Sequence, residues 1–399
     1  MTRLNIVTVL LIVGALVLHG CATNAGDPGT EIVIGSSVTF DSDIYDQEIQ
    51  FSIMLPDGYA EDTASYPVLY TLHTDFLHTA GAVEELAGIA TPDLIYVHLE
   101  TYNSGDLIPS KIEGRPTSGG ADRLLNFVRD ELVPLIDSRF RTQPFRIIHS
   151  CSWGGVFCLY ALLTQPDVFN ASLVATPWLI YDGDQQYMLN NIERFLQERT
   201  FTNNALFLAL GNDPDPGLKE SVDLLANMLS GSEKPGLRVQ YNYWPEEDHY
   251  SVGHKTVFDG LRWIFLPWRE IPENIALGGR IAIQHYQEEL ASRFGFDIGV
   301  HAGTLSDLGY RFMQQNLFDQ AIEMFTLRVE LSPDLPHSYF SLGRAYEAAG
   351  DYRSALENYQ TARDLARAQR RPDLSRYDDY ITAVREKIAA GPTDTSKPD

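Results

Sequence analysis

The sequence predicts an α/β domain followed by a smaller all-helical domain. In the first part of the chain, apolar runs typical of buried strands alternate with helical patterns. After Trp268 only helical patterns remain, and small and aromatic residues recur there at a spacing of 34 residues. With 399 residues, of which 44% are apolar, the chain is long enough to bury two hydrophobic cores.

The N-terminus has the pattern of an export signal. Residues 1–3 supply a short basic region, and residues 6–18 are almost all apolar but too few to span a bilayer comfortably. We therefore expect residues 1–20 to be a signal peptide that is removed.

The end of this signal resembles a bacterial lipobox. Residues 18–21 read Leu-His-Gly-Cys, and the resemblance implies that Cys21 becomes a lipid-modified N-terminus. Ala22 favours the outer membrane of a Gram-negative cell, and residues 21–35 are polar and glycine-containing, as in a flexible tether. We expect a lipid-anchored protein of the bacterial cell envelope, on the periplasmic face of the outer membrane. The alternative is an ordinary secretory signal with an incidental cysteine.

Composition excludes several function classes. The net charge of −24 argues against a nucleic-acid partner and against electrostatic docking to anionic lipid.

Cys151 and Cys158 lie seven residues apart at the start of a predicted helix, too far along its axis for a disulfide. No sequence feature indicates a cofactor.

The segment 145–155, Phe-Arg-Ile-Ile-His-Ser-Cys-Ser-Trp-Gly-Gly, predicts a strand that turns sharply into a helix at Ser152. This is the pattern of a nucleophile elbow, in which a serine hydroxyl projects from a strained turn and small neighbours leave room for the helix. Ser150 occupies the place of the first glycine in the usual G-x-S-x-G motif, and Gly154 occupies the second. The alternative is a buried strand that runs into an ordinary helix.

An acid and a histidine follow in the order typical of a catalytic triad. The apolar run 205–210 predicts a buried strand, and the loop after it contains Asp213 and Asp215. Residues 239–244 alternate as in a half-buried strand, and the polar loop after them ends in His249. We take Asp213 as the first choice for the acid, with Asp215 as the alternative.

These features and several flanking segments resemble the putative esterase family of the α/β-hydrolase superfamily, which includes enterobactin-type siderophore esterases and the esterase D group. The resemblance covers about residues 48–266 and is carried by segments 54–59, 66–70, 119–122, 131–136, 249–252 and 260–263. It implies an α/β-hydrolase fold, a Ser152 nucleophile and a His249 base, whereas the family places the acid less firmly. The chain departs from the family at Ser150 and at residues 72–76, Leu-His-Thr-Asp-Phe, where an acidic turn is usual.

The residue types define a reaction. A serine hydroxyl needs an imidazole to accept its proton, and a carboxylate on the far ring nitrogen fixes the tautomer of that imidazole. The oxyanion then needs donors, and we expect the backbone N–H of Trp153 and an N–H from the loop 74–76 around Asp75 to supply them.

Other candidate sites have simpler explanations. His254, five residues after His249, has no third ligand nearby to complete a zinc site. The spacing of His73, Asp75 and His78 matches no metal-ligand pattern, so we interpret them as lining the oxyanion loop. Cys151 is interpreted as a small buried apolar residue. No metal site is expected.

The C-terminal part predicts tetratricopeptide-like repeats. The pairs that recur after 34 residues are Leu308-Gly309 and Leu342-Gly343, Ala321 and Ala355, and Phe325 and Tyr359. We expect an esterase domain over residues 36–270, a connecting helix within 271–300, helical repeats over 301–390 and a disordered tail at 391–399.

Two functions of different class follow. The first is a serine esterase that hydrolyses a siderophore-type or other small carboxylic ester through an acyl-enzyme on Ser152. The second is a membrane-anchored scaffold in which the repeats bind a protein partner and the hydrolase domain is degenerate.

Overall fold

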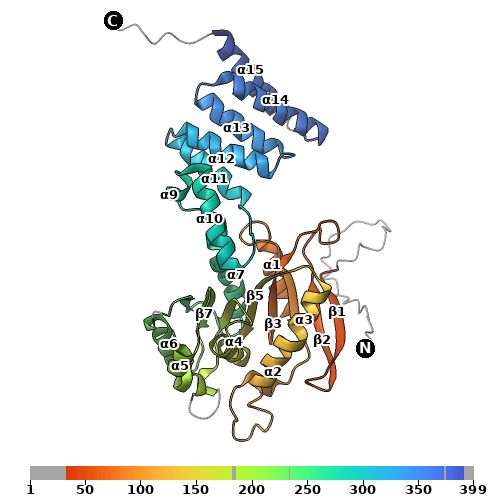
Figure 1. Ribbon diagram of the computed structural model, residues 1–399, viewed down its shortest axis with the longest axis vertical. Helices are drawn as coiled ribbons and strands as arrows, with labels where there is room; N and C mark the ends of the chain where they lie inside the picture. The colour runs from red at the N-terminus through yellow and green to blue at the C-terminus, as the bar shows by residue number, and fades with distance from the viewer. Residues whose placement is uncertain (1–32, 182–185, 233, 373, 391–399) are drawn as a thin grey trace, which may run out of the picture. The chain divides into compact units, whose positions relative to one another are not determined.

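The computed structural model describes residues 33–181, 186–232, 234–372 and 374–390 (Figure 1). The predicted signal peptide, Cys21, most of the tether and the tail after residue 390 lie outside the described residues. The chain divides into two compact units, the first ending at Phe265 but including residues 294–296, and the second formed by residues 266–293 and those from 297 onward. No helix among the described residues is long and apolar enough to cross a membrane.

The first unit is built on one eight-stranded sheet with strand order β1-β2-β4-β3-β5-β6-β7-β8. Strand β2 pairs antiparallel with β1 and β4, and the remaining neighbours pair in parallel. The strands are β1 (Ser36–Ser42), β2 (Gln47–Met54), β3 (Tyr66–Leu72), β4 (Ile95–Leu99), β5 (Thr142–Cys151), β6 (Ala171–Ala175), β7 (Asn204–Gly211) and β8 (Leu237–Trp244). This is the sheet of an α/β-hydrolase, so the predicted fold class is confirmed.

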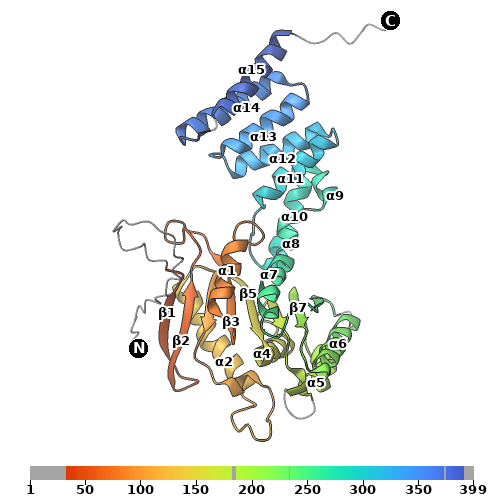
Figure 2. The ribbon, with the colours of Figure 1, turned by 180° about the vertical axis from the view of Figure 1, so that it is seen from behind.

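Helices cover both faces of this sheet (Figures 1 and 2). Helix α1 packs with α7, and α4 packs with α2 and α5. The helical segments of this unit are α1 (Phe76–Leu86), η1 (Ser104–Leu107), α2 (Ala121–Phe127), η2 (Val128–Leu132), α3 (Val133–Arg139), α4 (Ser152–Thr164), η3 (Leu179–Tyr181), α5 (Tyr187–Glu198), α6 (Pro216–Gly231) and α7 (Val252–Ile264). Every residue of α4 from Gly154 to Leu163 is buried, because the helix lies between the sheet and its neighbouring helices. This explains why its sequence is apolar on all sides.

The described part of the second unit is entirely helical, as predicted. Its helices are α8 (Leu266–Arg269), α9 (Glu273–Ala276), α10 (Gly279–Phe294), α11 (Ala302–Gln314), α12 (Phe318–Leu331), α13 (Pro336–Ala348), α14 (Tyr352–Ala368) and α15 (Leu374–Ala390). The predicted connecting helix lies within α10. Its last residue, Phe294, belongs to the first unit, where its ring packs 5.1 Å from Phe145 and 5.4 Å from Phe265 between ring centroids.

The 34-residue period corresponds to a repeated contact. A Cβ atom added to Gly309 on α11 would lie 2.6 Å from the ring of Phe325 on α12, and one added to Gly343 on α13 would lie 2.7 Å from the ring of Tyr359 on α14. Both rings are fully buried. The glycines therefore let each helix approach the aromatic ring of its partner.

Candidate active site

Ser152 lies at the turn between β5 and α4, where the nucleophile of an elbow is expected. Its backbone has φ of +56°, in the left-handed region that is unfavourable for a residue with a side chain. Among the described residues its hydroxyl has no hydrogen-bond partner, and it lines a cavity. The strained turn thus presents the hydroxyl at the carboxyl edge of the parallel strands.

Ser150, which replaces the usual glycine, fits beneath this turn. It is fully buried, and its Oγ donates a hydrogen bond of 2.5 Å to the carbonyl oxygen of Leu72 at the end of β3. A Cβ atom on Gly154 would lie only 1.8 Å from Ser150 Oγ. The serine hydroxyl thus fills the space that the absent side chain of Gly154 leaves.

The loops after β7 and β8 bring an acid and a histidine together. His249 Nδ1 lies 2.8 Å from Asp213 Oδ2, and the two side chains are only 20% and 10% exposed. Asp215 has a different role, because its carboxylate caps α6 by accepting the amide hydrogen of Gly217 at 3.0 Å. Of the two candidate acids, only Asp213 lies against the imidazole.

Backbone contacts hold these two loops in register. The amide of Asn212 donates to the carbonyl of Glu247 at 2.6 Å. A Cβ atom on Gly211 would lie 2.7 Å from the carbonyl oxygen of Asp248, so only glycine permits this approach. The short distance between the acid and the histidine therefore depends on close packing of the backbones.

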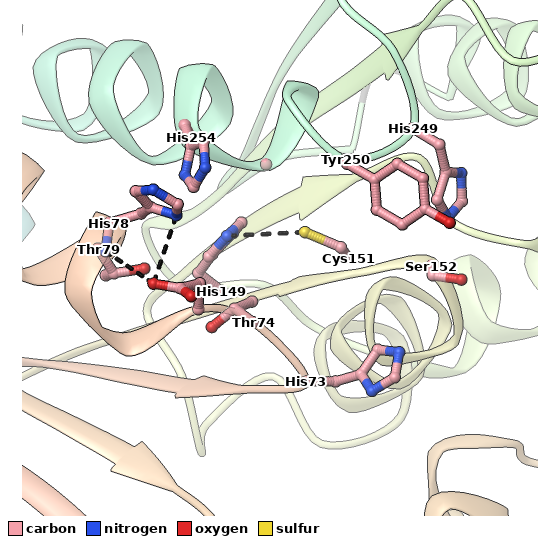
Figure 3. Close-up of a pocket in the computed structure, with 12 residues that line it drawn as sticks. His73, Thr74, His78, Thr79, His149, Cys151, Ser152, His249, Tyr250 and His254 are labelled. Carbon is pink, nitrogen blue, oxygen red and sulfur yellow. Dashed lines mark hydrogen bonds and ion pairs between the residues drawn. The ribbon is translucent and has the colours of Figure 1, made fainter.

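Ser152 and His249 line one cavity of about 340 Å³. Its lining residues are His73, Thr74, Asp75, His78, Thr79, His149, Cys151, Ser152, His249, Tyr250, Gly253 and His254. Figure 3 shows the side chains of His249 and Tyr250 on one side of Ser152 and that of His73 on the other. The structure records no hydrogen bond between Ser152 Oγ and His249; such contacts are often long in unliganded enzymes and shorten when substrate binds.

The loop that follows β3 borders the same cavity. His73 has φ of +54°, so the chain turns sharply there, and Asp75 caps α1 by accepting the amide hydrogen of His78 at 3.0 Å. On the other side of Ser152, Trp153 lies in the first turn of α4, where backbone N–H groups have no partner within the helix. Both predicted sources of oxyanion donors thus lie next to Ser152 or on its cavity.

Burial favours the uncharged form of three side chains that line the cavity, His149, Cys151 and His73. Burial lowers the pKa of His149 to about 4, and its Nδ1–H donates to the carbonyl of Leu173 at 2.9 Å. Burial raises the pKa of the Cys151 thiol to about 12, which makes it a poor nucleophile. Burial, and then the nearby His249, lower the pKa of His73. In the part of the chain that the structure describes, no cluster of side chains could hold a metal ion.

Sequence reasoning missed the role of Trp178. This residue follows β6, and its amide donates to the carbonyl of Ser152 at 3.2 Å. Its ring centroid lies 5.5 Å from that of His249 and 5.7 Å from that of Trp153, so it packs between His249 and the helix that begins at Ser152. The sequence places Trp178 shortly after the apolar run of β6, and this position at the end of a buried strand could have indicated a residue near the site.

Comparison with known proteins agrees with this geometry. The chain is 22% identical over 275 residues to the ferri-bacillibactin esterase BesA of Bacillus subtilis, covering 61% of this chain and 94% of the relative. It is 23% identical over 192 residues to a siderophore triacetylfusarinine C esterase of Aspergillus fumigatus, covering 41% and 65%. The structure resembles that of an IroE-like serine hydrolase from Shewanella oneidensis with a TM-score of 0.63 and 27% identity, covering 75% of this chain and all of the other.

A family model described as Putative esterase matches residues 42–252, more than half of the chain. This match includes the elbow, the acid loop and the histidine loop, and the relatives that resemble the chain are hydrolases of esters. The chain therefore belongs to the putative esterase family and is an ester hydrolase of the α/β-hydrolase fold.

Proposed function

We propose that the protein is a serine esterase that cleaves siderophore-type carboxylic esters through an acyl-enzyme on Ser152. The observation that carries the proposal is the left-handed Ser152 on the same cavity as His249, whose ring lies 2.8 Å from Asp213. The substrate class is supported by the two relatives, which are named as siderophore esterases.

In the first half of the reaction, Ser152 Oγ attacks the ester carbonyl carbon while His249 Nε2 accepts the hydroxyl proton. Asp213 holds the imidazole in the tautomer with hydrogen on Nδ1 and stabilises the imidazolium that forms. The backbone N–H of Trp153 and an N–H of the loop around Asp75 donate to the oxyanion, each donor being worth about 3 kcal/mol of barrier in known systems.

The tetrahedral intermediate then collapses, and His249 gives its proton to the departing alkoxide, which leaves the acyl group on Ser152. A water molecule attacks this acyl-enzyme after losing a proton to His249, and the carboxylic acid is released. Trp178 supports both halves of the reaction, because its ring packs against His249 and its amide donates a hydrogen bond to the carbonyl of Ser152.

The decisive experiment is labelling with a fluorophosphonate probe, followed by peptide mapping and by assays with ferri-bacillibactin, triacetylfusarinine C and p-nitrophenyl acetate. We expect the label on Ser152 and loss of all hydrolysis in Ser152→Ala with an unchanged circular dichroism spectrum. Cys151→Ala is the matched control and should keep its labelling. Labelling or hydrolysis that persists in Ser152→Ala would contradict the proposal.

We also propose that Cys21 carries a lipid anchor to the outer membrane and that the helices from α11 to α15 form a tetratricopeptide-like unit. The first proposal rests on the sequence alone. The second is supported by the 34-residue spacing of the buried glycine contacts. A scaffold with a degenerate hydrolase domain is less well supported, because Ser152 and His249 line one cavity and Asp213 lies against His249.

A further inference from the structure

His73 has an unusual backbone for a residue that carries a side chain. It follows β3 directly, and its φ of +54° lies in the left-handed region, where strain is found mainly at functional sites. Figure 3 shows its ring turned towards Ser152, on the side opposite to His249 and Tyr250. The turn therefore brings to Ser152 an imidazole that the mechanism given above does not use.

The loop that carries His73 is fastened to the turn at Ser152. Strand β3 pairs in parallel with β5, and at the end of this pairing the carbonyl of Leu72 accepts the hydroxyl hydrogen of Ser150 at 2.5 Å. A Cβ atom on Gly154 would lie 3.3 Å from the Cβ of His73, so the first turn of α4 packs directly against this residue. The sheet and α4 thus set the position of the imidazole relative to Ser152.

Tyr102 holds the ring of His73. It lies in the loop after β4, the strand next to β3, and it packs against the hydrophobic core of the first unit. The Tyr102 hydroxyl oxygen lies 3.0 Å from His73 Nδ1. Burial raises the pKa of Tyr102, and a hydrogen bond from the backbone of His73 lowers it, so the phenol oxygen also accepts that backbone N–H. One tyrosine therefore contacts both the backbone and the side chain of His73.

These contacts assign the tautomer of His73. The hydroxyl hydrogen of Tyr102 has no acceptor other than His73 Nδ1 among the described residues, so it is donated to that nitrogen. A neutral imidazole that accepts at Nδ1 carries its own hydrogen on Nε2. Burial, and then the nearby His249, lower the pKa of His73, so the ring is neutral at pH 7. In the part of the chain that the structure describes, the Nε2–H has no partner, and it is available to a ligand in the cavity.

A neutral N–H at this position suits an oxyanion. When Ser152 attacks an ester carbonyl, negative charge develops on the carbonyl oxygen, and donors already in place lower the barrier. His249 lies on one side of Ser152, and His73 lies on the other, in the loop from which oxyanion donors are expected. Because a neutral imidazole N–H donates without giving up its proton, His73 does not compete with His249 for the proton of Ser152.

We propose that His73 is a further catalytic residue, whose Nε2–H donates a hydrogen bond to the oxyanion that forms when Ser152 attacks the ester, and that Tyr102 is its positioning residue. This inference rests on the proposed function. It adds a side-chain donor to the backbone donors expected at Trp153 and in the loop around Asp75.

The test compares two substitutions of His73 that differ in reach. Asparagine tolerates a left-handed backbone and places its amide near the position of Nδ1, so His73→Asn removes the outer donor and keeps the turn. Glutamine is one carbon longer, and its amide N–H reaches the position of Nε2. We expect His73→Asn to lower kcat by about a hundredfold with little change in KM, and His73→Gln to recover most of that loss. Circular dichroism and urea denaturation check that both variants fold.

A series of esters separates an oxyanion donor from a leaving-group donor. We measure kcat/KM for p-nitrophenyl, phenyl and trifluoroethyl acetate, which share a carbonyl oxygen but differ in the basicity of the leaving alkoxide. An oxyanion donor acts on the shared oxygen, so His73→Asn should lower kcat/KM by the same factor for all three. A loss that grows with the basicity of the leaving group would overturn the proposal.

Tyr102→Phe tests the positioning role. It should lower kcat by about tenfold in the unchanged protein, because the ring of His73 loses the contact that fixes its tautomer. The same substitution should have no further effect in His73→Asn. Equal effects in both backgrounds would show that Tyr102 does not act through His73.

The matched control is His285→Asn, the same substitution at an exposed histidine of α10, which should hydrolyse all three esters as the unchanged protein does. Ser152→Ala in the same assays separates this inference from the proposed function. Full kcat in His73→Asn, or equal losses in His73→Asn and His73→Gln, would refute the role of His73 while an inactive Ser152→Ala still supports the esterase. Hydrolysis that persists in Ser152→Ala would overturn both.

Discussion

Ser150 shows how one residue can satisfy a motif that it formally breaks. The elbow needs small residues on both sides of the nucleophile because the helix packs closely on the strand. Here the serine hydroxyl points into the space above Gly154 and donates to Leu72 at the end of β3. Gly154, at the second glycine position of the motif, thus meets the requirement for a small residue. Ser150, at the first glycine position, gains a buried hydrogen bond.

This arrangement predicts a compensating pair of substitutions. Gly154→Ala should destabilise the protein by about 3 kcal/mol or more and abolish hydrolysis, because its Cβ would meet Ser150 Oγ at 1.8 Å. Adding Ser150→Gly removes that clash, so the double variant should regain most of the loss. Urea denaturation and p-nitrophenyl acetate hydrolysis measure both effects. Ser150→Gly alone is the control, and a double variant no better than Gly154→Ala would contradict the packing described here.

His149 predicts a pH dependence of stability. Burial lowers its pKa from 6.5 to about 4, so the unfolded state binds a proton more readily than the folded state between these values. Stability should therefore be complete above pH 6.5 and fall by about 3 kcal/mol as the pH is lowered towards 4. Asparagine keeps a donor near the position of Nδ1 but does not titrate, so His149→Asn should be less stable at pH 7 and show a flatter dependence. Urea denaturation at several pH values tests this, and parallel curves for the two proteins would refute it.

At the scale of elements, the parallel strands bring the site together by ending at one edge of the sheet. Strand β5 ends just before Ser152, β7 ends before Asp213 and β8 ends before the loop that contains His249. The choice between the two acids depends on the start of α6. Because Asp215 caps that helix, its carboxylate is directed to the amide of Gly217 rather than to the imidazole of His249.

The two carboxylates should therefore separate activity from stability. Asp213→Asn should lower kcat by about three to four orders of magnitude while leaving the fold intact, since it removes the group that fixes the histidine tautomer. Asp215→Ala should cost about 1 kcal/mol of stability through loss of the cap but keep most of the activity. Steady-state kinetics and thermal denaturation distinguish them. Equal activity losses in both variants would show that the cap and the acid are not separate functions.

At the scale of the whole molecule, the two units have separate hydrophobic cores. The core of the first unit lies between the sheet and its helices, whereas α11 to α15 bury their own aromatic and small residues. A defect in one core is thus expected to affect mainly that unit.

Gly343→Ala tests this independence. Its Cβ would lie 2.7 Å from the ring of Tyr359, so the helical unit should lose about 2–3 kcal/mol. Ester hydrolysis at 25 °C should be unchanged. Differential scanning calorimetry together with activity after heating resolves the two effects, with Thr361→Ala on the exposed face of α14 as a control. A matching loss of hydrolysis at 25 °C would show that the esterase unit depends on the helical core.

The sequence by itself determined the division into an α/β part and a helical part, the turn at Ser152 and the repeat period, because hydrophobic periodicity and small-residue spacing are local properties of the chain. It also singled out His249 and two carboxylates, Asp213 and Asp215, as candidates for the site. Only the tertiary structure decided which carboxylate meets His249, how Ser150 is accommodated and where Trp178 packs. Each of these depends on contacts between segments brought together by the sheet or by paired helices, and no local pattern records such distances.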